Sequence, residues 1–387
     1  MGYNESQDSA GKRAALVYLN NYMDGGRQAG MRLRKTIQDS IIRPLKVFTK
    51  DMRFEMREKG LPAYFAAIDG AEQEFCLHTH AFRRMREEAD LSSTTTRVML
   101  EGPEWDRKNL EMLLNSKFSN KGFIQRGGGM PRFINLVVGN QVRGFVGRGF
   151  KRHLRSGPLL DAFIKSCAQF GAMPVSAIAS DLRVTLRCML PYAFSPRSEE
   201  YLALGISFSN SDFGAGAFRL ELTVMSLRNG HVMPMKTLNG SGHGEGHNGG
   251  KGDDDAMDST ELSEETVLKL IHAKQGEVED LVRSALHQAS ANAFFDEVAE
   301  AMEKKISWHQ FERYLRGKLT QEEMEVVQSL LKKGSKSSEL PEVTYDSDDQ
   351  AIMDLWFASN VLGKIAEGAE GERKEELQSA AGKLLIS

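Results

Sequence analysis

The chain has 387 residues, of which 41% are hydrophobic and 27% are charged, and its formal net charge is −3. This length and hydrophobicity predict two or three folding units with a sizeable core, which excludes a chain that is disordered throughout. The three cysteines are odd in number and far apart, which excludes a disulfide or zinc framework and fits a reducing cytosol. Because no run of about 18 apolar residues occurs, we expect no membrane partner.

The charge is divided unevenly along the chain. Residues 1–237 hold 34 Lys+Arg and 23 Asp+Glu, a net charge of +11, whereas residues 238–387 hold 16 and 30, a net charge of −14. A basic part joined to an acidic part predicts that the basic part meets a polyanion. The acidic part is either plain surface or a competitor for the same basic face.

Residues 10–115 are predicted to be mainly helical. Charged runs with recurrent apolar positions occur in "MRLRKTIQDSIIRPLKVFTKDMRFEMREKG" and "HAFRRMREEADL". Pro44 must end or kink the first of these helices. In "CLHTH", Cys76, His78 and His80 occupy alternate positions, but the segment that follows is typical of a helix, so we predict no metal site.

The centre of the chain changes to a period of two. In "DLRVTLRCML" the apolar residues alternate with Arg183, Thr185 and Arg187, which predicts a half-buried strand. "YLALGISFS" and "FRLELTVMSL" predict two more strands, and Asn229–Gly230 predicts a hairpin turn into "HVMPM". "GPLLDAFIKSCAQFGA" predicts an amphipathic helix that ends at Gly171.

The rest of the chain predicts a linker followed by helices. Residues 239–259 are rich in Gly, Ser and Asp and predict a flexible segment, whose His243 and His247 lack further metal ligands. "TQEEMEVVQSLLKKG" begins with a capping box from Thr320 to Glu323.

Together these patterns predict an α+β protein, in which a central antiparallel sheet with a packed helix lies between helical regions. The predicted divisions are a mainly helical basic region at 1–115, a central α+β basic domain at 116–237, a flexible linker at 238–259 and an acidic helical region at 260–387.

The most informative segment is residues 112–160, which contains no Asp or Glu. It holds nine basic residues, which are the candidate nucleic-acid-binding residues: Lys117, Lys121, Arg126, Arg132, Arg143, Arg148, Lys151, Arg152 and Arg155. Phosphate binding has a physical reason to exclude acids, because a nearby carboxylate cancels the gain from released counterions. The alternatives are the solvated face of a structural domain and a protein or capsid interface.

Aromatic residues and glycines interleave with these cations. Phenylalanines that face outward, such as Phe145 or Phe150, would stack on bases, whereas inward ones would fill the core. Gly144, Gly147 and Gly149 would let the backbone approach a ligand or another strand closely.

Catalytic motifs are weak in this sequence. "NSDFG" contains Asp-Phe-Gly without the other kinase motifs, and "QRGGGMPR" lacks the Gly-Lys-Ser/Thr of a P-loop. A two-metal nuclease would need several converging carboxylates, which are sparse in the centre but which sequence alone cannot place together. We therefore predict no catalytic residue and no cofactor, with a nuclease left open.

Four segments in order resemble a family of phage and plasmid proteins, domain of unknown function 932. They are "FCLHTHAFRRMREEADLSS" (75–93), "RGFVGRGFKRHLRSGPLLDAF" (143–163), "LALGISFSNSDFGAGAFRLELTVMSLRNGHVMP" (202–234) and "MDLWFASNVLGKIAEGAEGERKEELQSAAGKLL" (353–385). The chain departs from the family at Phe150–Lys151, where the family has Arg-Tyr, and at Leu227 or Arg228, where it has Cys.

The resemblance implies a phage or mobile-element protein in the cytoplasm of a bacterial host. Together with the basic segment, it predicts a non-catalytic protein that binds nucleic acid, with single-stranded DNA as the preferred partner. A role in single-strand annealing or recombination, as a homo-oligomer, follows only by analogy with other phage proteins. The alternative is a virion-associated or host-interaction protein that assembles through its helical regions.

Overall fold

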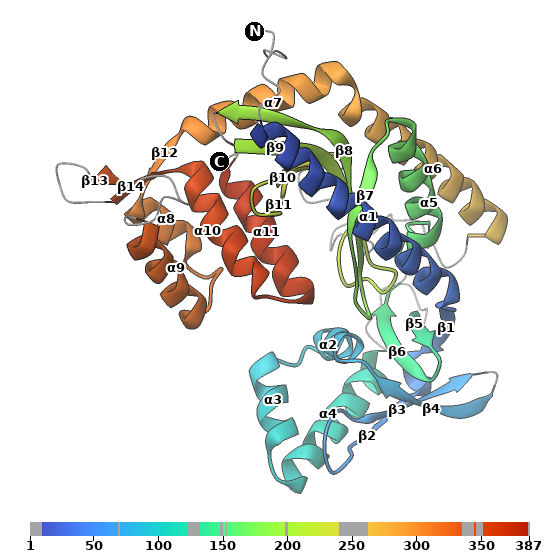
Figure 1. The fold of residues 1–387 in the computed structure, drawn as a ribbon. Helices are drawn as coiled ribbons and strands as arrows, with labels where there is room; N and C mark the ends of the chain where they lie inside the picture. Colours follow the sequence, from blue (N-terminus) through green and yellow to red (C-terminus); the bar gives the residue numbers. More distant parts are fainter. Residues whose placement is uncertain are drawn as a thin grey trace.

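The computed structural model describes residues 10–68, 70–121, 132–147, 150–151, 153–197, 200–239, 262–334, 344–345 and 351–385. These residues form a larger unit around a five-stranded sheet and a smaller unit around a six-stranded sheet (Figure 1). Helices pack against both sheets, so the predicted α+β class is confirmed. In the part of the chain that is described, none of the helices combines the length and the apolar character needed to cross a bilayer.

The smaller unit has a sheet of strand order β1-β5-β6-β4-β3-β2, in which β4 and β6 are parallel and the other neighbours are antiparallel. Its elements are β1 (Arg43–Phe48), η1 (Thr49–Asp51), β2 (Met52–Glu55), β3 (Ala63–Ile68), β4 (Ala71–Leu77), α2 (Thr79–Glu88), α3 (Ser93–Glu101), α4 (Glu104–Lys121), β5 (Arg132–Val138) and β6 (Gln141–Val146).

The prediction that residues 10–115 are mainly helical was wrong for β1 to β4, although α1 to α4 are helices. In β2, Met52 and Phe54 are buried while Arg53 and Glu55 are exposed, which is the period of a strand. These strands are short and their charged residues are dense, so the period of two is hidden among residues that also favour helices. Tertiary pairing decides the outcome, because each strand completes the hydrogen bonds of its neighbour.

The first helix, α1 (Ala10–Asp39), ends before Pro44 as predicted, but it belongs to the larger unit. Its residues Leu19 and Met23 are buried against the central sheet. Gly26 lies directly on the backbone of Pro174, where no Cβ would fit.

The central sheet is wholly antiparallel, with strand order β11-β10-β9-β8-β7. Its strands are β7 (Met173–Ala179), β8 (Val184–Arg197), β9 (Glu200–Asn210), β10 (Arg219–Ser226) and β11 (Val232–Thr237). The predicted hairpin at Asn229–Gly230 is confirmed, because β10 pairs with β11 and Gly230 has a positive φ of 73°. The predicted helix is α5 (Ser156–Gln169), followed by Gly171 with φ 71°.

The C-terminal region is largely helical, as predicted, and also contains a small sheet of order β12-β14-β13 that was not predicted. Its elements are α6 (Glu264–Leu286), α7 (Gln288–Glu303), β12 (Lys305–Ser307), α8 (Trp308–Leu315), α9 (Gln321–Gly334), β13 (Thr344–Tyr345), β14 (Ala351–Asp354), α10 (Leu355–Glu367) and α11 (Gly371–Leu385). The capping box is confirmed, because Glu323 N donates to Thr320 Oγ1 and Thr320 N donates to Glu323 Oε2.

The units do not follow the predicted divisions of the chain. Strands β5 and β6, placed in the central domain by sequence, pair with β1 and β4 of the smaller unit. Helix α1, placed in the N-terminal region, packs on the central sheet. The predicted linker, beyond Asn239, lies outside the described residues, as do His243 and His247.

Helix α2 contains a buried histidine, which leads to a prediction about stability. Burial, followed by the charge of Arg83, lowers the pKa of His80 from 6.5 to about 4. The unfolded chain therefore binds a proton that folded His80 does not bind, so this residue's contribution to stability increases as the pH rises from about 4 to 6.5.

Between pH 5 and pH 7 the expected gain from His80 is about 2 kcal/mol in the free energy of unfolding. Urea denaturation at both pH values measures how much the free energy of unfolding increases from pH 5 to pH 7. This increase should be about 2 kcal/mol smaller in His80→Gln than in the wild type. Equal pH dependence in the two proteins would show that His80 titrates normally in the folded state.

Candidate anion-binding cleft

The two faces of the central sheet have different chemistry. One face is apolar and packs against α5, α6 and α7 through residues such as Leu186, Leu204 and Phe208. The other face is apolar only beneath α1, where Met189, Ala203 and Met225 lie. Beyond α1 this second face becomes polar.

The polar part is formed by facing residues on three adjacent strands. Arg187 on β8 pairs with Ser207 on β9, which pairs with Glu221 on β10. The next row consists of Thr185, Ser209 and Arg219 in the same order. Because alternate residues of a strand share one face, these side chains all point to the same side as Arg183.

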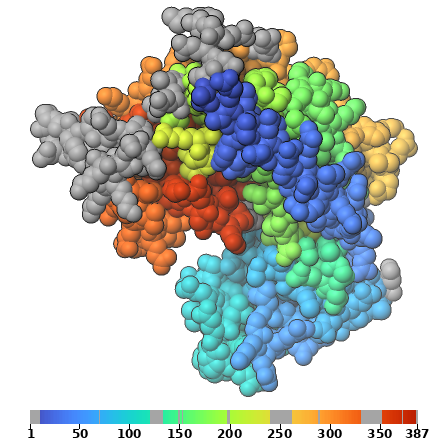
Figure 2. All heavy atoms as spheres, in the orientation of Figure 1, coloured from blue at the N-terminus to red at the C-terminus, as the bar shows by residue number. Residues whose placement is uncertain are grey.

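Helix α11 lies beside this polar face and encloses it. Gly382 of α11 is placed directly against the carbonyl of Pro234 on β11, which leaves no room for a side chain. Together, the sheet, α11, the α8–α9 connection and α2 enclose a cleft of about 590 Å³. In the space-filling view the surface is hollowed between the red C-terminal helices and the cyan part of the smaller unit (Figure 2).

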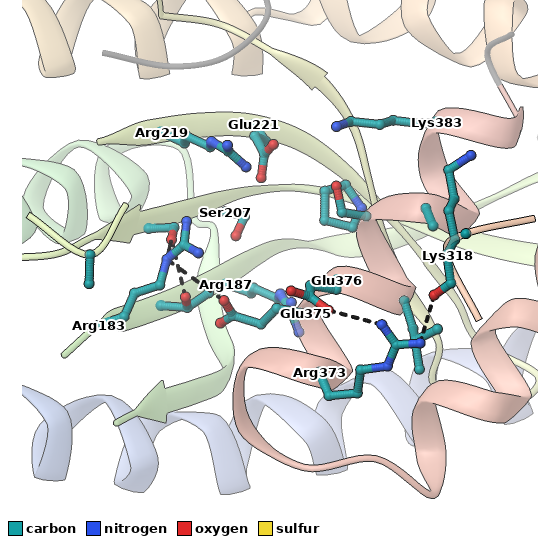
Figure 3. A pocket seen from close by; sticks show the side chains of 18 of the residues that line it. Arg183, Arg187, Ser207, Arg219, Glu221, Lys318, Arg373, Glu375, Glu376 and Lys383 are labelled. Atoms are coloured by element: carbon teal, nitrogen blue, oxygen red, sulfur yellow. Dashed lines mark hydrogen bonds and ion pairs between the residues drawn. The ribbon is translucent and has the colours of Figure 1, made fainter. Parts of the chain in front are cut away.

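Cations outnumber carboxylates in this cleft. Among the described residues that line it, seven are basic, and they come from distant parts of the chain: Arg83, Arg183, Arg187, Arg219, Lys318, Arg373 and Lys383. The acidic residues are Glu221, Glu375 and Glu376. Side chains from the sheet and from α11 converge in the close-up view (Figure 3).

Some of these cations already have partners. Arg183 Nε donates to Ser209 Oγ at 2.8 Å and lies 3.9 Å from Glu375 Oε2. Arg373 binds Glu323 and Glu376 and donates to the carbonyl of Lys318 at 2.7 Å. These contacts hold α11 in place, so Arg373 serves the fold.

Arg187 is different, because it is buried and makes no hydrogen bond or ion pair with a described residue. Its exposed fraction is 3%, its Nε has no hydrogen-bond partner, and no ion pair joins it to another described residue. Burial lowers the pKa of the guanidinium, and the charges of Glu375 and Glu221 oppose that shift. Since arginine stays protonated in proteins, Arg187 is a buried cation that lacks an anion at hydrogen-bonding distance.

The rim of the cleft adds two further crowded cations. Lys318 Nζ donates to the carbonyl of Tyr314 at 2.6 Å and lies 3.6 Å from the centre of the Tyr314 ring. Burial, and then the charge of Lys383, lower the pKa of Lys318. Like charges held close together are unfavourable unless an anion separates them, so this arrangement favours an anionic ligand.

Four of the nine residues predicted from the acid-free segment have described side chains, and these lie on different parts of the fold. Lys117 is exposed on α4, while Arg143 on β6 donates to the carbonyl of Asp181 at 3.1 Å. The side chains of Lys121 and Arg132 are not described, and Arg126, Arg148 and Arg152 lie outside the described residues.

Lys151 and Arg155 do lie together, at a smaller cavity of about 240 Å³ near the start of α5. Asp212 also lines this cavity and accepts a hydrogen bond from Ser156 N at 2.7 Å. Burial raises the pKa of Asp212 above its usual value, and this effect outweighs the opposing effects of the Ser156 hydrogen bonds and the Arg155 charge. A carboxylate is therefore already placed at the N-terminus of α5.

Of the two alternatives for the phenylalanines of this segment, the described ones take the inward one. Phe118, Phe133 and Phe145 form a buried aromatic cluster, with 4.5 Å between the ring centres of the last two. Phe150 is buried in a separate core at the junction of the two units. Gly144 approaches another backbone segment rather than a ligand, since a Cβ there would lie 2.8 Å from the Phe213 carbonyl.

Sequence reasoning did find the alternation of Arg183, Thr185 and Arg187, but it interpreted their face as half-exposed. Thr185 and Arg187 are each 3% exposed, because the C-terminal helices cover them. The missed signal was that β9 and β10 also carry polar residues on alternate positions, at Ser207 and Ser209 and at Arg219 and Glu221.

No protein-family model matches this chain, and no match was found among the curated proteins or the solved structures. The resemblance to domain of unknown function 932 therefore stays a prediction.

Proposed function

We propose that this protein binds single-stranded nucleic acid through the cleft beside α11 and does no chemistry on it. The observation that carries the proposal is Arg187, a buried guanidinium with no hydrogen bond or ion pair to a described residue, on the floor of a cleft with excess positive charge. Arginine, with its planar fork of donors, is suited to phosphate, and phosphates are the groups that a nucleic acid presents at regular intervals.

The cleft supports backbone binding rather than base reading. Tyr314 is the single aromatic residue among the described residues that line it, and Lys318 already covers its ring. Base stacking therefore contributes little here, and the cations supply most of the interaction. We expect weak dependence on sequence and strong dependence on salt, which is the behaviour of binding through phosphates.

Fluorescence anisotropy over a salt series, with labelled single-stranded and double-stranded oligonucleotides, tests this proposal. Each cation that neutralises a phosphate of a single strand contributes about 0.7 to the slope of log K against log salt. Lys318→Ala and Lys383→Ala should each lower the slope by about that amount, because both side chains are exposed at the rim.

Lys269→Ala is the matched control, since Lys269 pairs with Glu265 on α6, a helix that packs on the other side of the sheet. Its slope should equal that of the wild type. No binding at about 50 mM salt, or a slope unaffected by either rim variant, would rule out this cleft as a nucleic-acid site. The alternative of a virion or host-interaction role would then be favoured.

A further inference from the structure

The cations of the cleft lie at two depths. At the rim, Lys318 and Lys383 are exposed, and the side chain of Arg83 is 57% exposed. On the floor, Arg187 is 3% exposed. A strand that passes across the rim presents its internal phosphates to the rim cations, and its backbone continues in both directions. An internal phosphate can reach the floor only if the nucleotides on both sides of it also enter the cleft.

A strand end has no such restriction. Its terminal group can enter a recess while the preceding backbone stays at the rim. The cleft volume of about 590 Å³ lies within the range of pockets that hold small molecules, of about 300–1,000 Å³. Its inner wall is polar, with the hydroxyl residues Ser207 and Ser209 beside Arg187 and Arg219.

The charge of the recess also favours a terminal phosphate over an internal one. A phosphomonoester carries about −1.5 to −2 charges near neutral pH, whereas a phosphodiester carries one. The cleft has four more basic than acidic lining residues, and Glu221 and Glu375 are the only carboxylates of the described lining near its floor. Because the described lining of the cleft is positively charged overall, it attracts a dianion more strongly than a monoanion.

From these observations we propose that the recess binds a phosphomonoester at the end of a nucleic-acid strand. Arg187 binds the terminal phosphate on the floor, and Lys318 and Lys383 bind the backbone that leads to it. This inference rests on the proposed function and adds the group that the protein recognises. The 5′ and 3′ ends share this chemistry, and the experiment distinguishes them.

The experiment compares four versions of one labelled single strand of about 12 nucleotides: 5′-phosphate, 3′-phosphate, both ends hydroxyl, and 5′-phosphate hybridised to a complement. Anisotropy gives the Kd of each for the full chain. A charge-assisted, bidentate contact is worth about 1.5–3 kcal/mol, so one phosphorylated end should bind about tenfold to 100-fold more tightly than the hydroxyl strand.

Arg187→Gln should remove this preference, so that phosphorylated and hydroxyl strands bind equally and about as tightly as the hydroxyl strand binds the wild type. Lys383→Ala should weaken all single strands by a similar factor and leave the preference intact. A thermal unfolding curve for each variant shows whether the variant is folded. The comparison of the four strands on the wild-type protein tests the proposal even if a variant does not fold.

The outcomes separate the two proposals. Equal Kd values for all single strands would overturn the terminal-phosphate inference and leave the proposed function intact. No binding of any strand would overturn both. If inorganic phosphate and a nucleoside monophosphate compete as strongly as the phosphorylated strand, the strand is not the ligand and both proposals fail. Tight binding that is specific for one phosphorylated end and lost in Arg187→Gln supports both.

Discussion

Replacing Arg187 with methionine should make the protein more stable and at the same time weaken its binding to a phosphorylated strand. Arg187 is a buried charge without a hydrogen-bond partner for Nε, which is an unfavourable arrangement in a protein without ligand. Methionine is unbranched and flexible, so it can fill the space of the arginine stem without adding charge.

We expect the free energy of unfolding in urea to rise by about 1 kcal/mol, since a buried polar group without a hydrogen-bond partner costs about 1–3 kcal/mol and methionine has no such group. The affinity for a phosphorylated strand should fall about tenfold to 100-fold. If Arg187→Met is more stable and also binds the phosphorylated strand more weakly, Arg187 serves binding at a cost in stability.

The control is Arg373→Met, because Arg373 lines the same cleft but binds Glu323 and Glu376. This variant should lose stability, as breaking a paired charge leaves its carboxylate partners unpaired. If Arg187→Met is also destabilised by more than about 1 kcal/mol, Arg187 is a structural partner of Glu375 and Glu221, and the cleft loses its main support as an anion site.

Replacing Glu375 with glutamine should strengthen nucleic-acid binding. Glu375 Oε2 lies 3.9 Å from Arg183 Nε, and the charge of Glu375 also raises the pKa of Arg187. This carboxylate is therefore the ion-pair partner of Arg183, and its charge also acts on Arg187, to which it makes no hydrogen bond. An incoming phosphate must compete with it, because both anions favour the same guanidinium groups.

We expect Glu375→Gln to lower the Kd for a single strand about tenfold at low salt, which is about 1.4 kcal/mol. The salt slope should become steeper, since an additional cation is available to a phosphate. The fold should lose some stability, because Arg183 keeps Ser209 but loses its carboxylate partner.

Glu265→Gln is the matched control for this prediction. It changes the net charge by the same amount at an exposed position on α6, where the Glu265 side chain is 77% exposed. Anisotropy should show the same Kd for this variant as for the wild type. A similar gain in affinity in both variants would mean that the overall charge, and not Glu375 in the cleft, sets the strength of binding.

Several elements of the fold could be predicted from local sequence alone. The alternation at 181–190, the turn at Asn229–Gly230 and the Gly171 stop identified β8, the β10–β11 hairpin and α5. These signals are local, because each depends on a period of two or 3.6 or on the backbone freedom of a glycine. The same local reasoning failed for β1 to β4, where short strands with dense charge have no clear period.

The site depended on information that no local pattern contains. The acid-free segment at 112–160 suggested one basic surface, but its described cations lie on different elements, and four of its five phenylalanines fill cores. Exclusion of acids from that segment does not place its cations together. The fifth phenylalanine of the segment, Phe123, lies outside the described residues.

The sequence by itself determined which residues share a face of each central strand, and so it brought Arg183, Thr185 and Arg187 together. Only the tertiary structure decided what lies opposite them. Helix α11, from the far end of the chain, covers the polar face and brings Glu375 and Lys383 to it. The periodicity of a strand specifies the direction of its side chains, whereas burial depends on which distant element packs there. Only the fold therefore shows that Arg187 is a buried cation with no hydrogen bond or ion pair to a described residue.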